Sequence, residues 1–171
     1  MEARVNESNH AIDLDEVTER LHAFVDAQTA LVLAVQDPEG GPPVVGTLPF
    51  VDDDGRFCVL GSDLAPHTRA MRQAGEVSVA LMADQQDTRN PFARERAQWT
   101  AAVESVERDT DAFERITAQL RERHGKTVDL LCGLGDFHLL CLRPGSGRYV
   151  NGFGRAFGLA GLVPDEHLRK G

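Results

Sequence analysis

The order of apolar and polar residues predicts one helix followed by a series of short strands. Apolar side chains between Asp13 and Gln28 recur three and four residues apart, as in an amphipathic helix, and Asp13 with Glu16 resembles a capping box. After residue 29, short apolar or alternating runs are separated by turns rich in Gly, Pro and Asp. We predict seven strands, at residues 30–36, 43–51, 56–61, 76–83, 97–104, 136–143 and 148–151.

Three further helices are expected between these strands. Ser62 or Asp63 would cap the first of them, and Gly75 would end it. The predicted ranges are 63–73, 109–125 and 127–134.

The connections between the strands favour an antiparallel fold. Most are short, and the alternation of strand and helix that marks a doubly wound sheet is missing, so we predict a mainly β (α+β) fold, an antiparallel β-barrel with peripheral helices. The length favours one domain, at residues 14–158, between a flexible N-terminal arm at 1–13 and a C-terminal tail at 159–171. Pro43 and Pro49 lack the donor that a sheet ladder needs, so their strand should lie at an edge or be irregular at both ends.

The strand at 136–143 is apolar on both faces, with Phe137 and Leu139 on one side and Leu140 and Leu142 on the other. Its outer face should therefore meet a helix or a second subunit. We favour a homodimer.

The amino-acid composition limits the cellular location and the binding partners that we expect. The formal charge of −9 disfavours nucleic acid and anionic membranes as partners, and no apolar run is long enough to span a membrane. Cys58, Cys132 and Cys141 are odd in number and lie in apolar segments without metal-site spacing, so we expect neither a disulfide framework nor a zinc site. These features predict a soluble, cytoplasmic protein.

Two arginines precede the long alternating segment that begins at Ala97. If that segment is a strand, Arg94 and Arg96 point together, and paired guanidinium groups suit a carboxylate or a phosphate. The alternative is that they pair with Glu95 and Glu104 on a solvated rim. The alternation breaks after residue 103, which indicates a β-bulge or the end of the strand before the acidic run at 107–111.

Several blocks of sequence, in order, resemble the haem-utilisation branch (HugZ/HutZ type) of the pyridoxamine 5′-phosphate oxidase-like, FMN-binding split-barrel superfamily. The resemblance covers residues 29–157 and has a weaker echo at 166–170. The blocks are Leu64-Ala65-Pro66-His67-Thr68-Arg69, Asn90-Pro91-Phe92-Ala93-Arg94-Glu95-Arg96, Val106-Glu107-Arg108-Asp109, Asp136-Phe137 and Gly152-Phe153-Gly154-Arg155-Ala156-Phe157.

The resemblance implies a homodimer of split barrels and a set of site residues. His167 stands where the branch carries its axial histidine to haem iron, and Asp136 where a carboxylate hydrogen-bonds that histidine. Arg96 stands where an arginine lines the haem site, and His67 matches a further histidine. Arg69, Arg94 and Arg96 are the local cations available to an anionic group of the ligand.

The function implied is haem binding for haem utilisation, with oxidative haem degradation as the activity. The alternatives are an FMN-binding oxidoreductase of the same fold and a non-catalytic haem carrier, and the sequence does not identify an electron donor. Three features depart from the branch. Gly46-Thr47-Leu48 precedes Pro49-Phe50 where the branch usually has a Ser-aromatic pair, Pro66 replaces a basic residue, and Gln98 replaces a threonine after the arginines. FMN, whose phosphate would have few cations against the net charge, should bind weakly.

Overall fold

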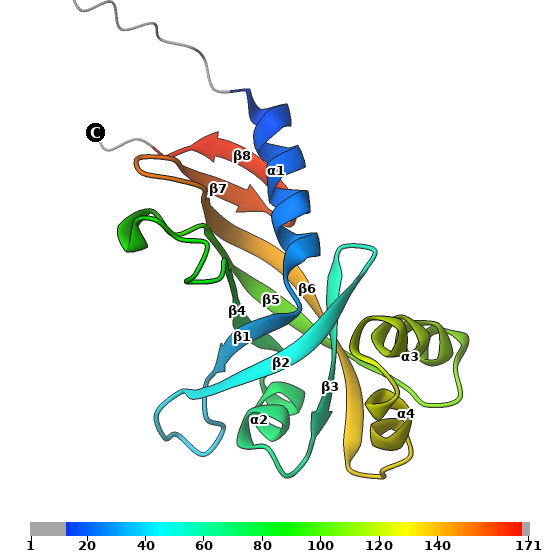
Figure 1. The fold of residues 1–171 in the computed structure, drawn as a ribbon. Coiled ribbons are helices and arrows are strands. Elements are labelled where there is room, and N and C mark those ends of the chain that lie inside the picture. The colour runs from blue at the N-terminus through cyan, green and yellow to red at the C-terminus, as the bar shows by residue number, and fades with distance from the viewer. Residues whose placement is uncertain (1–12, 169–171) are drawn as a thin grey trace, which may run out of the picture.

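The structure is a computed structural model that describes residues 13–168 (Figure 1). The predicted N-terminal arm, apart from Asp13, lies outside these residues. The described strands form one antiparallel sheet in the order β3-β2-β1-β4-β5-β6-β7-β8, and pairing of β3 with β6 closes the first six into a barrel. This confirms the predicted barrel. The strands are β1 (Ala30–Val35), β2 (Val44–Asp53), β3 (Arg56–Ser62), β4 (Glu76–Met82), β5 (Arg96–Val106), β6 (Phe137–Val150), β7 (Ala156–Ala160) and β8 (Val163–His167).

Within residues 13–168, four α-helices surround the barrel, and two of them, α1 and α3, begin after a residue whose side chain caps the helix. Asp13 caps the first helix by accepting a hydrogen bond from the Asp15 amide. The predicted cap of the second helix is wrong: Ala65 occupies that position, because Ser62 forms a turn before the helix instead. Gly75, in the left-handed conformation, ends that helix as predicted. The helices are α1 (Leu14–Ala27), α2 (Pro66–Ala74), α3 (Asp111–His124) and α4 (Thr127–Cys132), with a short 3-10 helix η1 (Pro91–Ala93).

Two apolar cores hold these elements together. The larger core fills the barrel and includes the buried faces of α1 and α2, which approach it from opposite ends (Figure 1). The smaller core lies outside the barrel wall, where Ile116 and Leu120 of α3 pack against Leu139 and Cys141 of β6. The doubly apolar strand predicted at 136–143 is therefore covered by helices on its outer face, and it no longer argues for a second subunit.

The strands predicted at 136–143 and 148–151, with a turn between them, form a single strand, because β6 continues through residues 144–147 to Val150. Trp99 pairs with Gly147 and Ala101 with Pro144, so three steps along β6 match two along β5 and form a bulge. Trp99 presses on Gly147, where an added Cβ would lie 2.5 Å from the indole Cδ1. No bulge lies near residue 103; the other expectation, that the strand ends before the acidic run, is correct.

The strand β2 lies between β3 and β1, so its predicted edge position is wrong. Pro49 is tolerated because β2 changes partners there. Its last pair with β1 is Pro49 with Ala30, and its pairing with β3 begins at Phe50. The segment interpreted as a tail from residue 159 contributes the end of β7 and all of β8.

A disulfide joins Cys58 and Cys141, which corrects the expectation that none forms. The two cysteines are directly paired across β3 and β6, the seam that closes the barrel. They are 83 residues apart in sequence, so only the barrel topology reveals their proximity. Cys132 remains a free thiol. No helix within residues 13–168 is both long and apolar enough to cross a membrane.

Candidate functional site

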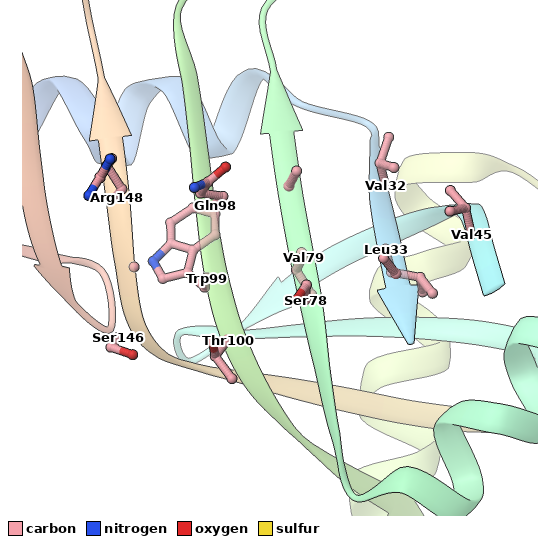
Figure 2. A pocket seen from close by; sticks show the side chains of 13 residues that line it. Val32, Leu33, Val45, Ser78, Val79, Gln98, Trp99, Thr100, Ser146 and Arg148 are labelled. Carbon is pink, nitrogen blue, oxygen red and sulfur yellow. The ribbon is translucent and has the colours of Figure 1, made fainter. Parts of the chain in front are cut away.

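On one face of the barrel sheet, no helix of residues 13–168 is packed. Outward side chains of β1, β2, β4, β5 and β6 line a shallow depression of about 670 Å³ there (Figure 2). Val32 and Val45 make one side of this open face apolar, while Gln98, Thr100 and Arg148 make the other side polar. Val45 is 64% exposed. An apolar patch with a polar margin is typical of a surface that another molecule covers.

The open face differs in charge from the protein as a whole. Although the chain has a net charge of −9, none of the described residues that line the depression is acidic. Arg148 has no hydrogen-bond or ion-pair partner among residues 13–168. The open face is therefore neutral to positive, and it offers one unpaired guanidinium to an anionic group.

Three of the predicted site residues, His167, Arg94 and Arg96, lie near the C-terminal end of β6, and we call them the upper group. His167 is on β8, and its ring centroid is 5.1 Å from that of Phe157. The His167 Nε2 atom is 3.3 Å from the Gly154 carbonyl oxygen. The imidazole is thus part of the sheet extension, held against the loop between β6 and β7.

The two arginines of the upper group bind main-chain oxygens. Arg94 donates to the Ala83 carbonyl at 2.7 Å, and Arg96 donates to the Arg94 carbonyl at 2.9 Å. Each bond occupies one of the five N–H groups of a guanidinium. Both side chains are half-buried and keep donors for a ligand.

The two acids that the alternative would pair with these arginines, Glu95 and Glu104, have other partners. Glu95 pairs with Arg20 at 3.0 Å and accepts a hydrogen bond from the Tyr149 hydroxyl. Burial, together with the Glu95 carboxylate, raises the pKa of Tyr149. Glu104 pairs with Arg143 at 2.9 Å. The alternative of a rim of paired charges is therefore wrong for this segment.

The other three predicted site residues, His67, Arg69 and Asp136, lie where β6 begins, and we call them the lower group. Asp136 accepts a hydrogen bond from the Ser62 hydroxyl at 2.6 Å, through its Oδ2 atom. Arg69 donates to the main-chain oxygen of Asp63. The lower group is thus tied to the turn between β3 and α2.

His67 faces the barrel and packs on β2. A Cβ added to Gly46 would lie 2.5 Å from the His67 Cγ, so the ring occupies the space that glycine leaves. The His67 Nε2 is buried and has no hydrogen-bond partner within residues 13–168. Burial lowers the pKa of His67 below its usual 6.5, so the ring is neutral near pH 7.

The upper group lies near one end of β6 and the lower group near its other end. Figure 1 shows the course of this strand through the barrel. Arg96 pairs with Val150 at one end of β6, and Asp136 precedes Phe137 at the other. Strand β6 has 14 residues, and at a rise of about 3.3 Å per residue its ends are on the order of 40 Å apart. Within one chain, therefore, His167 does not contact Asp136.

Sequence reasoning missed a polar cluster beside the lower group. Asp63 accepts from Arg72 at 2.7 Å, and its other oxygen lies 2.7 Å from His138 Nε2. These contacts, led by the one with His138, lower the pKa of Asp63. Asp63 and His138 are 75 positions apart in sequence, and no local motif links them. Their assembly depends on the pairing of β3 with β6.

The sequence matches a known protein family and a known relative. Residues 17–151 match the family model for pyridoxamine 5′-phosphate oxidase. The chain is 36% identical over 150 residues to the haem oxygenase HutZ of Vibrio cholerae, an alignment that covers 86% of this chain and 85% of that protein.

Two solved structures are similar in shape. One, described as HutZ, the haem storage protein from Vibrio cholerae, has a TM-score of 0.68 and 32% identity over 78% of this chain and 91% of its own. The other, Campylobacter jejuni ChuZ, has a TM-score of 0.83, covers 93% of this chain and 65% of its own, and at 21% identity shares the fold.

Proposed function

Because the chain belongs to the pyridoxamine 5′-phosphate oxidase family, we propose that it is a haem-binding split-barrel protein that acts in haem utilisation. The observation that carries this proposal is the 36% identity, over 86% of the chain, to a protein named as a haem oxygenase. HutZ is described both as an oxygenase and as a storage protein. Oxidative haem degradation and non-catalytic haem carriage are accordingly the two forms of the proposal.

The proposal includes a homodimer formed through the open face. This face is apolar on one side, lacks acidic residues among those that line it, and has no helix over it. Two copies packed on it about a two-fold axis that runs across the strands would reverse the direction of β6 between them. Such a dimer brings the upper group of one copy toward the lower group of its partner.

In this arrangement haem lies between the copies, with His167 from one chain and Asp136 from the other. The His167 imidazole would hold haem, and a carboxylate that accepts the other N–H of that ring would fix its tautomer and increase its basicity. Asp136 suits that task, because no residue within 13–168 donates to its Oδ1 atom. Holding haem through Nε2 would replace the contact of that atom with the Gly154 carbonyl.

The two arginines of the upper group are suitable donors for the propionate groups of haem. Arg94 and Arg96 keep free N–H groups that suit the two propionates of haem. His67 is left out of the proposed site, because its ring packs on Gly46 inside the barrel. When bound, haem supplies the redox chemistry, and this chain supplies the ligand, the orientation and the exclusion of water.

FMN is the alternative ligand, favoured by the family as a whole. Its phosphate needs donors, yet Pro66 gives no N–H at the first position of α2, and the chain has a net charge of −9. We expect FMN to bind weakly.

A cytoplasmic location completes the proposal. Cys132 is a free thiol, and both cysteines of the disulfide are fully buried, which shields that bond from small thiols.

Absorption titrations of the purified protein, separately with haem and with FMN, test the function. We expect a Soret band that saturates at one haem per chain and little quenching of flavin fluorescence. Tight flavin binding without a Soret band would favour the FMN alternative. Light scattering tests the dimer, and a monomer mass at micromolar concentration would contradict it.

A further inference from the structure

We propose that Ser62 is a positioning residue that holds the Asp136 carboxylate in the orientation needed to accept a hydrogen bond from the axial histidine. This inference rests on the proposed haem function. It concerns a contact inside one chain, however, so it is testable without haem as well as with it.

The geometry fixes the Ser62 hydroxyl from two sides. Its Oγ atom accepts a hydrogen bond from the Leu64 amide at 3.1 Å and donates to Asp136 Oδ2 at 2.6 Å. Because the amide N–H already points at the oxygen, the hydroxyl proton is directed to the carboxylate. A second link runs alongside, since the Asp63 amide donates to the Asp136 carbonyl at 2.8 Å.

The two oxygens of Asp136 are thereby given different roles. Oδ2 is held by Ser62, whereas no residue within 13–168 donates to Oδ1. The neighbouring Asp63 differs, because Arg72 and His138 engage both of its oxygens. Of these two carboxylates, Asp136 is the one with an oxygen to offer to a partner's imidazole.

Among the hydrogen bonds within residues 13–168, the one from Ser62 is the one that the Asp136 side chain accepts. Gly135 precedes Asp136, and a Cβ added there would meet nothing within 4 Å, so there is open space beside that residue. Ser62 and Phe137 are the last pair of the β3–β6 ladder, which places Asp136 just beyond the sheet. Without the serine hydroxyl, the carboxylate would exchange among rotamers.

The test uses the full chain with Ser62→Ala, Ser62→Thr and Asp136→Asn. Ser105→Ala, at an exposed serine of β5, is the matched control. The first readout is the ¹³C resonance of the Asp136 carboxyl carbon in haem-free protein. The second is the ferric absorption spectrum with haem, recorded across pH, and urea unfolding is measured in parallel to separate stability from positioning.

We expect Ser62→Ala to move the Asp136 carboxyl resonance and to shift the ferric spectrum in the same direction as Asp136→Asn, by a smaller amount. Ser62→Thr, which keeps the hydroxyl, should restore both signals, and Ser105→Ala should change neither. If Asp136→Asn alters the spectrum but Ser62→Ala does not, the positioning role is refuted and the haem proposal stands. If the wild-type protein binds no haem, the proposed function fails, and the carboxyl resonance still tests the contact.

Discussion

Replacing Gly46 with alanine tests the interpretation that His67 is a packing residue of the barrel. The new Cβ would lie 2.5, 2.6 and 2.8 Å from His67 Cγ, Nδ1 and Cδ2, closer than carbon atoms approach. The clash involves the base of a rigid ring, so relief requires movement of the α2 side chain or of β2. Overpacking of this kind costs about 1–3 kcal/mol. We therefore expect Gly46→Ala to lower the free energy of unfolding by about 2 kcal/mol.

The effect should change sign when the ring is removed. In a His67→Ala background the new methyl group has space, and alanine in place of glycine is expected to stabilise by about 0.5 kcal/mol through the unfolded chain. Urea unfolding followed by the fluorescence of Trp99, the single tryptophan and 2% exposed, measures both effects. Gly135→Ala, where the added Cβ meets no atom, is the control. Equal costs of Gly46→Ala in both backgrounds would refute the contact.

Three other predictions follow from particular contacts. Burial lowers the pKa of His67 below 6.5, so the unfolded chain binds a proton that the folded chain excludes. The free energy of unfolding should therefore fall as the pH drops below about 6.5. A His67→Ala variant with the same pH profile in urea unfolding would contradict this. The disulfide spans 83 residues, so its reduction should lower the free energy of unfolding by up to about 4–5 kcal/mol. Equal urea midpoints with and without a strong phosphine reductant would show that the disulfide does not form. Arg96→Ala should weaken haem binding by about 1–2 kcal/mol in the absorption titration if the guanidinium pairs with a propionate, and an unchanged affinity would remove that role.

The barrel was predictable because most of its strands are marked by local signals. Alternation identified β4 and β5, and Gly75 marked the end of α2. The errors arose where a distant partner decides the local conformation. Trp99 packs on Gly147 and turns an apparent hairpin loop into a bulge of β6, and Pro49 is accommodated by a change of partner strand. The sequences of these short segments alone predict neither the bulge of β6 nor the change of partner strand at Pro49.

The resemblance proposes site residues, whereas their arrangement depends on the fold. It named His167 and Asp136 together, but His167 on β8 lies beside the far end of β6 from Asp136, so the proposed pair can form only through a second copy. The support of Asp136 by Ser62 depends on the β3–β6 seam, which links residues 74 positions apart. Topology, which the sequence pattern does not specify, therefore determines what each residue contacts.

A mixed dimer tests the shared haem site most directly. One chain carries His167→Ala and the other Asp136→Asn, and each homodimer variant is measured alone as a control. If haem lies between copies, the mixed dimer has one site with both mutations and one with neither, so about half of the bound haem should show the wild-type ferric spectrum. If each site were built from a single chain, every site would carry a mutation, and the absence of any wild-type component would contradict the account.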